Sequence, residues 1–534
     1  MDELTNRLLE SLRLREPALT KLLGNIAIDS TEVIENIGHR KPDPQKRRKL
    51  LEALKPCWEK LELPPVAREA MALLEDPDTH IVIAGQQPAL WGGPLMVVSK
   101  ALSVTVLARQ LERAGIPAVA LFWVADDDHD GGELNPGRFH SGKQPGNPHA
   151  EGRRPLYDLR HRQLPQDRLA ALSDAIGDAP YAREAIRIAS AAIASGPAEE
   201  FVSLLSQLLP DTPLLPVLPR WFRTLQRPIV ERCVQNPGQF RELIVEACRE
   251  QQSLGIPTPV PAPRDEPVFI IDEDGLRRRP REIRQPLSEI LQQDPMSVSP
   301  DALLRTIVQD EVIDPSAVIL GPTEFCYALQ TRKVRQQWGL SRPLWLPRPR
   351  LRPIDQEIID AITAEGIERD EIAPGVAATD LICDPDVKAE AQGITKAGTE
   401  LIDRIEQLNH RDDASPALQR RARRLVHTWR QQLERLEIAI GRGLGGTAED
   451  RRDHVSRLLE ELFPGGLEPE RNRNLLDLIA HHGSAVLDQM RRTLQRAAGH
   501  WDGSIHPFDL RSEGKTDSNP ARQEQREEQH DGQR

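Results

Sequence analysis

The chain has 534 residues and a net charge of −12; 28% of its residues are charged and 39% are hydrophobic. This composition is typical of a soluble globular protein, and the acidic balance argues against general nucleic-acid binding, which needs a basic surface. No apolar run reaches the roughly 18 residues that a membrane helix requires, so we expect no membrane partner. Five dispersed cysteines and an N-terminus unlike a signal peptide indicate a cytoplasmic protein.

The first 75 residues predict an N-terminal segment of short helices separated by prolines. Residues 78–135 then predict one βαβ unit. Its strands are the apolar runs Ile81–Ala84 and Ala118–Ala125, and its helix begins at Pro94. Polar residues follow both runs, at the carboxyl ends of the strands, where ligands bind in open α/β sheets.

Residues 76–383 form the predicted α/β core, with insertions at about 136–210 and 220–300. Because strands alternate with helices along this region, we expect a mostly parallel sheet. A turn at Asp274-Gly275 predicts a β-hairpin, and Ser299-Pro300 predicts a helix start, with serine as the cap. The further predicted strands are Leu214–Leu218 at a sheet edge, Val268–Asp272, Ser316–Leu320 and Pro343–Leu346.

After residue 384 the apolar residues recur near the heptad period, first over 394–408 and then over 418–440. The break at Arg411–Pro416 makes an αα-hairpin, which either packs on the sheet or forms a coiled coil that serves a homodimer. We assign residues 384–510 to a helical coiled-coil and dimerisation domain. Residues 511–534 are almost wholly polar and are expected to be disordered.

The loop Gly85–Pro94 (GQQPALWGGP) is the first candidate ligand site. Gly92 and Gly93 place bare backbone before a helix, whose free N–H groups attract anions. Gln86 and Gln87 add neutral donors and acceptors. The alternative is a plain tight turn, since the loop matches no phosphate-binding consensus. Lys100 lies nearly two turns into the helix and either reaches ligand oxygens or lies on a solvated face.

The run Asp126-Asp127-Asp128-His129-Asp130 places four carboxylates in five residues. Close carboxylates repel by about 1 kcal/mol per pair in water and about 4 kcal/mol at an effective dielectric constant near 20. The run therefore indicates either a solvated turn or a bound cation: Mg²⁺ with a nucleotide, a substrate ammonium or His129 itself. His129 is a candidate base if an aspartate orients its ring.

A third candidate is the stretch 318–330 (VILGPTEFCYALQ), where a strand again runs into Gly-Pro and a helix. Glu324 in the first helical turn is favourable with the helix dipole. Tyr327 and Gln330 follow at one-turn intervals, so the three side chains are predicted to face one pocket mouth. The alternative is a capped helix packed on the sheet.

In order along the chain, GQQPALWGGPLMVVSKAL, FWVADDDHDGGELN, SVSPDALLRTIVQD, LGPTEFCYALQ and PLWLPRPRLRPID resemble the motifs of the bacillithiol-biosynthesis cysteine ligase family. The resemblance spans about residues 78–510. It implies a Rossmann-like core with inserted connecting segments, and a coiled-coil domain that dimerises the enzyme. One departure is Asp126-Asp127, where the family usually carries Ser-Glu.

The reaction implied by this resemblance joins L-cysteine to the malyl carboxylate of glucosaminyl-malate, so the expected partners are small-molecule substrates. A free carboxylate must be activated before an amine attacks it, which implies ATP with Mg²⁺ and no tightly bound metal. An acyl-adenylate is the simplest intermediate, and an acyl-phosphate stays open. The alternatives are a nucleotidyltransferase-like enzyme for another small substrate, a degenerate dimeric scaffold, and a metal site at 126–130.

We hypothesise the following roles for individual residues. Lys100 stabilises carboxylate or phosphate charge. Asp128, His129 and Asp130 bind or deprotonate the cysteine ammonium, with Asp130 orienting His129. The acceptor or phosphate site is lined by Gln86, Gln87, Gly92 and Gly93; the pocket is completed by Arg305, Glu324, Tyr327 and Gln330; and a second nucleotide contact is formed by Gly465, Gly466 and Arg471.

Overall fold

The computed structural model describes residues 2–23, 27–143, 145–147, 152–382, 385–407 and 449–510, with short runs between 418 and 433. Unit 1 contains the described residues up to Pro353 and from Glu470 onward, and unit 2 contains Ile354–Pro469. The predicted boundaries at 384 and 510 therefore differ from the observed division. Unit 2 begins earlier, and the last helices belong to unit 1. The predicted tail, 511–534, lies outside the described residues.

Five parallel strands form the central sheet of unit 1 in the order β3-β2-β1-β7-β8. The order reverses between β1 and β7, because the chain passes from β1 to β2 on one side and returns as β7 on the other. Such a switch point opens a crevice at the carboxyl ends of the strands. The strands are β1 (His80–Gln86), β2 (Ala118–Val124), β3 (Leu214–Val217), β7 (Ala317–Leu320) and β8 (Leu344–Pro347).

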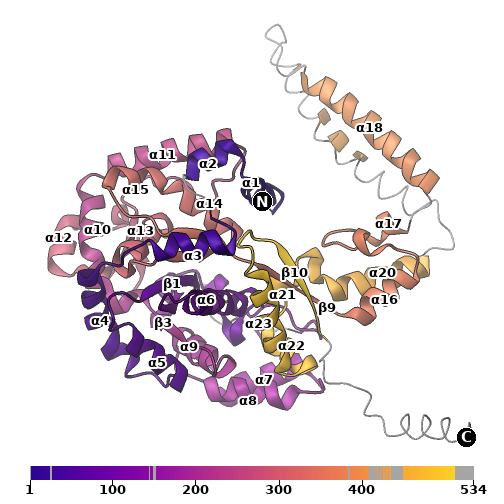
Figure 1. Cartoon of the computed structure of the whole chain (residues 1–534). Helices are drawn as coiled ribbons and strands as arrows, with labels where there is room; N and C mark the ends of the chain where they lie inside the picture. Colours follow the sequence, from indigo (N-terminus) through magenta and orange to yellow (C-terminus); the bar gives the residue numbers. More distant parts are fainter. Residues whose placement is uncertain are drawn as a thin grey trace, which may run out of the picture. The chain divides into compact units, whose positions relative to one another are not determined.

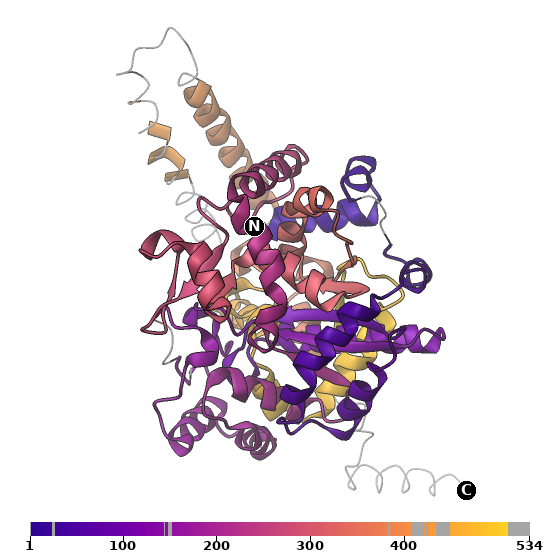
Figure 2. The ribbon, with the colours of Figure 1, turned by 90° about the vertical axis from the view of Figure 1, so that its left-hand side faces the viewer.

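Alternate residues of the strands face two separate hydrophobic cores, as the two-residue period of a strand requires. Val82 and Phe122 enter one core, and Ile83 and Leu121 enter the other. Helices cover both faces of the sheet (Figures 1 and 2), which explains why β1 and β2 are almost wholly apolar. The βαβ unit and the edge strand β3 are thus confirmed.

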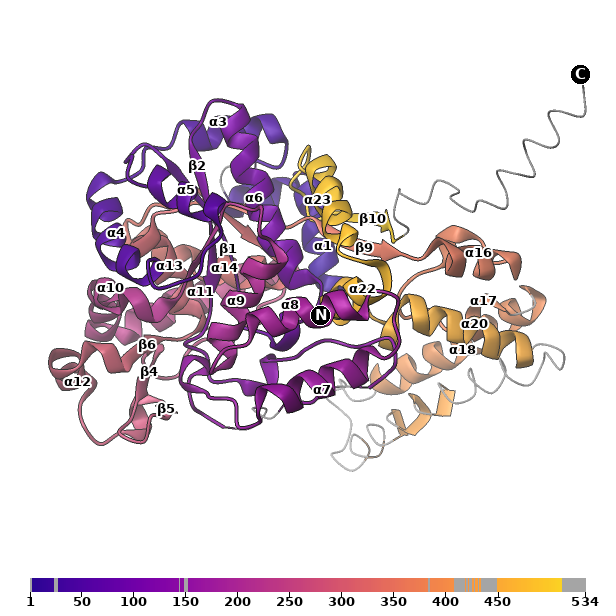
Figure 3. The same cartoon turned by 90° about the horizontal axis from the view of Figure 1, so that it is seen from below.

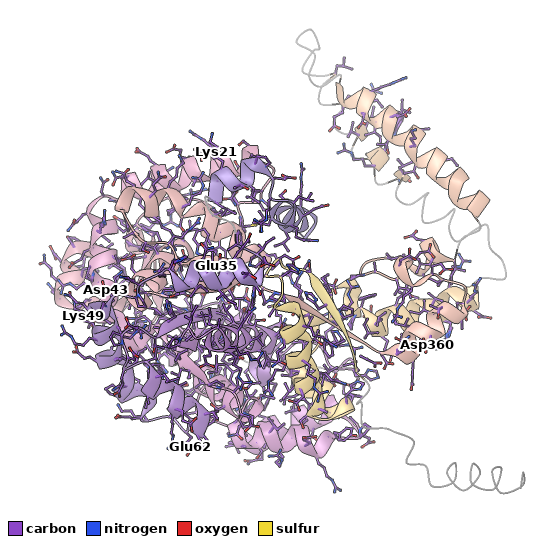
Figure 4. The ribbon with its side chains drawn as sticks, in the orientation of Figure 1. Lys21, Glu35, Asp43, Lys49, Glu62 and Asp360 are labelled. Atoms are coloured by element: carbon purple, nitrogen blue, oxygen red, sulfur yellow. The ribbon has the colours of Figure 1, made fainter. Side chains whose placement is uncertain are left out.

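One face is covered by α6 (Met96–Arg113), which packs against β1, β2 and the late helix α23 (Ala485–Ala497). Also contributing to this core are α8 (Ala182–Ala192), α9 (Pro197–Leu208) and α22 (Leu475–His482). The predicted N-terminal helices are confirmed as α1 (Asp2–Arg13), α2 (Pro17–Leu23), α3 (Ser30–Gly38), α4 (Pro44–Trp58) and α5 (Pro65–Leu73). Charged side chains on these helices, such as Lys21, Glu35 and Lys49, are exposed (Figure 4).

The second insertion carries a three-stranded antiparallel sheet, β5-β4-β6, which lies beside α12 (Leu287–Gln293; Figure 3). Its strands are β4 (Val268–Ile271), β5 (Arg277–Arg278) and β6 (Val298–Pro300). The predicted hairpin is confirmed, but the predicted helix start at Ser299-Pro300 is wrong. Ser299 pairs with Phe269 in the sheet, and Asp301 instead caps α13 (Ala302–Ile313) by accepting from the amides of Leu303 and Leu304.

The other helices of unit 1 are α7 (Pro165–Ile176), α10 (Arg223–Gln235), α11 (Pro237–Ser253), α12 (Leu287–Gln293), α14 (Pro322–Gln330), α15 (Arg332–Trp338) and α21 (Pro469–Asn472). A pair of strands missing from the predictions, β9 (Arg350–Ile354) and β10 (Ile505–Asp509), forms a separate sheet. Within the described part of the chain, no helix is both long and apolar enough to cross a bilayer.

Unit 2 has a small core of its own, which includes Ile362, Val455 and Phe463. Its helices are α16 (Gln356–Ala364), α17 (Ala378–Leu381), α18 (Pro385–Gln407) and α20 (Glu449–Leu462). The first predicted heptad segment, 394–408, is helical up to Gln407, where α18 ends, and residue 408 lies outside the described residues. Most of the second, 418–440, lies outside the described residues, so the dimerising coiled coil stays a prediction.

Candidate active site

The candidate site lies at the carboxyl ends of β1, β2 and β7, beside the switch point. Gln86 ends β1, Asp126 is the second residue after β2, and Gly321 directly follows β7. Since parallel strands end at the same sheet edge, these three segments converge, as the sequence predicted.

Lys100 lies at the centre of this edge and is almost fully buried. Its Nζ donates to Gly85 O at 3.1 Å, to Gln86 Oε1 at 2.6 Å and to Glu324 Oε1 at 2.8 Å. An ammonium has three donors, so all three are in use. Burial lowers the pKa of Lys100, and the Glu324 carboxylate opposes that shift. Lys100 therefore ties β1 to α14, and the alternative of a solvated lysine is wrong.

Glu324 also closes the first turn of α14, because its Oε2 accepts from Gly321 N at 2.6 Å. Tyr327, one turn further on, is half-buried, and its pKa is raised by burial and by the Glu324 charge. Gln330 does not join them. Its amide is fully buried and binds the backbone of Val260 in both directions, at 2.6 and 3.2 Å. Of the three residues predicted to face one pocket mouth, Glu324 and Tyr327 remain as candidates. Gln330 instead holds α14 against the loop that contains Val260.

Asp128 is the most heavily bonded group of the acidic run. Its carboxylate accepts from Gln87 Nε2 at 3.0 Å and from the His129 amide at 2.8 Å. Arg277 and Arg305 approach its two oxygens at 3.4 Å each. Burial would raise the pKa of Asp128, but the Arg305 and Arg277 charges and the hydrogen bond from the His129 backbone amide oppose burial, and that pKa lies far below its ordinary value.

His129 has two neighbours at Nδ1 that require opposite roles. Arg277 Nη1 lies at 3.2 Å and must donate, whereas Asp128 Oδ1 lies at 3.5 Å and must accept. The arginine contact is shorter and is within hydrogen-bond range, so we assign Nδ1 as the acceptor from these two distances. A neutral His129 then carries its proton on Nε2. The ring is partly exposed and lies 5.2 Å from the ring of Phe269.

Asp130 does not orient His129, contrary to the prediction. Its side chain instead accepts from Gly132 N at 3.0 Å and starts a short 3₁₀ turn. Aspartate commonly bonds a backbone amide two residues ahead in this way. Asp130 is exposed, and among the described residues the polar contacts of the His129 ring are those to Asp128 and Arg277.

Asp126 and Asp127, the first two aspartates of the run, are buried, and each is paired with an arginine from the segment that follows β3. Arg220 Nε lies 3.2 Å from Asp126, and Arg223 forms an ion pair with Asp127. Both guanidiniums also lie over the ring of Tyr157, at 5.2 Å. Burial raises the pKa of Asp126 well above its ordinary value. The cations that this run requires are therefore arginines of the protein itself.

The Gly92-Gly93 turn does not form the predicted anion cradle. Gly93 N donates to Leu90 O, and Leu95 N donates to Arg473 O, so amides of this turn are already satisfied. Asn474 Nδ2 in turn donates to Trp91 O at 3.0 Å. Both glycines have positive φ, which only glycine adopts without strain. The turn therefore anchors α22 rather than a phosphate.

The predicted second nucleotide contact is divided between the units, since Gly465 and Gly466 lie in unit 2 and Arg471 lies in unit 1. Within unit 2, the Gly465 amide donates to the Glu460 carboxylate at 2.9 and 3.0 Å. The Gly465 amide that a phosphate would need as a donor is therefore already bonded to the Glu460 carboxylate.

Three arginines were missing from the predicted site: Arg220, Arg223 and Arg277. The excess negative charge of the run 126–130 predicted that positive groups lie nearby, but it did not identify which residues supply them. In the described part of the chain, no three His, Cys, Asp or Glu side chains are grouped as metal ligands. The carboxylates of Asp126, Asp127 and Asp128 face arginines and Asp130 accepts from Gly132 N, so the structure does not support the alternative of a metal site there.

The sequence model described as "Bacillithiol biosynthesis BshC, N-terminal Rossmann-like domain" matches residues 5–349. A protein of Heliobacterium modesticaldum is 25% identical over 482 residues, 80% of this chain and 83% of its own length. One from Thermus thermophilus is 27% identical over 495 residues, 86% of this chain and 93% of its own. Both carry the name "Putative cysteine ligase BshC". Every predicted site residue up to Gln330 lies within the matched range.

Proposed function

The chain belongs to the BshC family of bacillithiol biosynthesis, whose Rossmann-like domain it carries over residues 5–349, and we propose that it is a cysteine ligase. The observation that carries this proposal is that the family match contains the whole cluster at the sheet edge, from Gln86 to Tyr327. The names of its relatives, which span most of the chain, support the same activity.

The proposed reaction joins the amine of L-cysteine to the malyl carboxylate of glucosaminyl-malate. The amine nitrogen attacks the activated carbonyl carbon, an amide bond forms, and the activating group leaves with the former carboxylate oxygen. ATP with Mg²⁺ is the proposed source of activation, by way of an acyl-adenylate or an acyl-phosphate. The residues predicted to hold its phosphates do not fit that role, because the Gly93 amide and the Lys100 ammonium are engaged internally. We assign no residue to the nucleotide.

His129 is proposed as the group that acts on the reacting atoms. With Nδ1 accepting from Arg277, its Nε2–H is a donor for the oxygen that gains negative charge when the amine attacks. Asp128 is proposed to hold His129 and Arg277 in place rather than to bind the cysteine ammonium, because its oxygens already accept from four groups.

A homodimer through the predicted helical hairpin of residues 394–440 is the proposed assembly. Large apolar side chains are exposed there at heptad-like spacing: Ile394, Leu401, Leu418, Leu425 and Trp429. Contiguous exposed apolar surface is typical of interaction sites. Sedimentation equilibrium of the full chain, compared with Leu401→Glu, tests this proposal, and a monomeric wild-type protein contradicts it. We also propose a cytoplasmic location, which the free cysteines of the described residues favour.

The activity is tested by incubating purified protein with glucosaminyl-malate, L-cysteine and ATP, and following both thiol product and nucleotide by mass spectrometry. We expect a product thiol, with AMP or ADP revealing the activated intermediate. Folded protein that gives no product with a verified acceptor contradicts the proposal. Nucleotide turnover with another small acceptor would then favour the nucleotidyltransferase-like alternative, and absence of any turnover would favour the binding scaffold.

A further inference from the structure

Two guanidiniums converge on one carboxylate at the sheet edge. Arg277 approaches Asp128 Oδ1, and Arg305 approaches Asp128 Oδ2, each at 3.4 Å. Among the described residues, Asp128 is the carboxylate that Arg305 contacts, and the more distant Asp127 adds a weaker attraction. Hydrogen bonds between a guanidinium and an anion are strong, so an anionic ligand beside Arg305 would be favoured.

Arg277 has little capacity left for a ligand. It is almost fully buried, and its remaining nitrogens donate to Ser299 Oγ at 3.1 Å and Pro300 O at 2.9 Å. Asp128 is equally occupied, because Gln87 and the His129 amide bind it besides the two arginines. These groups form a satisfied neutral unit, so Asp128 has no lone pair left for a substrate ammonium.

Arg305 differs from Arg277. Within the described residues, its side chain makes one hydrogen bond, the 3.4 Å contact to Asp128, and 18% of the side chain is exposed. A guanidinium has five N–H donors in a planar fork, so several stay available. Arg305 lies on α13, one turn after the Asp301 cap, so its backbone is held in place by the helix.

Tyr327 supplies a second available donor at the same place. Its hydroxyl makes no hydrogen bond to any described residue, although its neighbours on α14 are bonded. Arg305 on α13 and Tyr327 on α14 come from two helices that contact each other, and the charge of Arg305 acts on Tyr327. Burial and the Glu324 carboxylate raise the pKa of Tyr327, so its hydroxyl keeps its proton at neutral pH.

We propose that Arg305 and Tyr327 form the receptor for a substrate carboxylate that takes no part in bond formation. A guanidinium fork binds a carboxylate through two parallel hydrogen bonds, and the phenol adds a third. This inference rests on the proposed ligase function, which offers two sources of such a carboxylate. One is the α-carboxylate of the incoming amino acid, and the other is the second carboxylate of the malyl group.

The test is calorimetric titration of the full-length protein with L-cysteine, cysteamine and L-malate, without ATP. Cysteamine has the amine and thiol of cysteine but no carboxylate. We compare wild type with Arg305→Met, Arg305→Lys and Tyr327→Phe. Arg281→Gln is the control, because Arg281 is another arginine of unit 1 and its side chain is 60% exposed. Melting temperatures of all variants establish that each is folded.

We expect Arg305→Met to weaken carboxylate binding about 10- to 100-fold, the range for losing hydrogen bonds to a charged group. Tyr327→Phe should weaken binding about 3- to 10-fold, Arg305→Lys should restore part of the loss, and Arg281→Gln should change nothing. If cysteine binds far better than cysteamine and Arg305→Met removes that difference, the carboxylate is that of the amino acid. If malate alone depends on Arg305, the carboxylate is that of the acceptor.

The proposal is overturned if folded Arg305→Met binds both carboxylates as tightly as wild type, or if wild type binds neither. A separate measurement of thiol product on wild type distinguishes the two proposals. Arg305-dependent binding without product contradicts the ligase and keeps the receptor, whereas product formation with Arg305-independent binding contradicts only the receptor.

Discussion

Replacing Lys100 by methionine distinguishes a lysine that holds the sheet edge together from one that contacts substrate. The substitution preserves the length of the side chain but removes the ammonium that joins Gly85, Gln86 and Glu324. Breaking a buried ion pair costs about 3–5 kcal/mol. We take about 3 kcal/mol, because Glu324 keeps its bond to the Gly321 amide and water reaches its partly exposed side chain.

For a unit of roughly 400 residues, an unfolding entropy of about 2 cal/mol/K per residue gives about 0.8 kcal/mol/K, so Lys100→Met should lower the melting temperature by about 4 °C. Differential scanning calorimetry measures this shift. Lys49→Met, at an exposed helical lysine, is the control and should change the free energy of unfolding by less than about 0.5 kcal/mol. Lys100→Met combined with Glu324→Gln should lose less than the sum of the single changes.

The reasoning is refuted if Lys100→Met unfolds within 1 °C (about 0.8 kcal/mol) of wild type. Loss of turnover without loss of stability would then assign Lys100 to the substrate, as the sequence predicted. A melting temperature that falls as expected, with turnover reduced in the double variant as well, supports a positioning role for the ammonium.

Three further predictions concern stability. Gly93→Ala should cost more than about 1 kcal/mol in denaturant titration, because φ is +66° and the new Cβ would lie 2.5 Å from that of Ala89. Glu470→Gln should cost about 3 kcal/mol or more, since it leaves Arg348 buried without the carboxylate that it binds through both nitrogens; an unchanged denaturation midpoint would contradict it. Asp128 has a lowered pKa, so its stabilisation is complete above its ordinary value of 3.8 and declines as the pH falls below that value; Asp128→Asn should flatten the fall in melting temperature between about pH 5 and pH 2.

The sheet was predictable from the sequence because its strands carry unambiguous local signals. The runs 81–84 and 118–125 are apolar throughout, which is typical of strands covered on both faces, and the helix between them has its own periodicity. The start of α13 was misplaced because Ser299 and Asp301 are both good caps. Only the pairing of Ser299 with Phe269, distant in sequence, decides between them.

The sequence predicted where the site lies, but it did not predict which side chains contact one another there. Segment order put Lys100, Asp128 and Glu324 at one edge of the sheet. Whether a given donor stays available for a ligand depends on partners distant in the chain, and single-residue patterns do not contain that information. Gln330 shows the limit most clearly: helical spacing put it in line with Tyr327, while its actual partner is the backbone of Val260.

The pairing of aspartates with arginines explains how the acidic run can exist and why it tolerates a departure from its family. Adjacent carboxylates would repel by about 4 kcal/mol per close pair at an effective dielectric constant near 20, and each of the first three meets a guanidinium instead. The family resemblance leads us to expect glutamate at position 127. Here Asp127 contacts Arg223, at the base of α10, whereas Asp128 alone contacts His129. The shorter aspartate therefore still reaches a guanidinium at position 127, and the described polar contacts of the His129 ring, to Asp128 and Arg277, do not involve it.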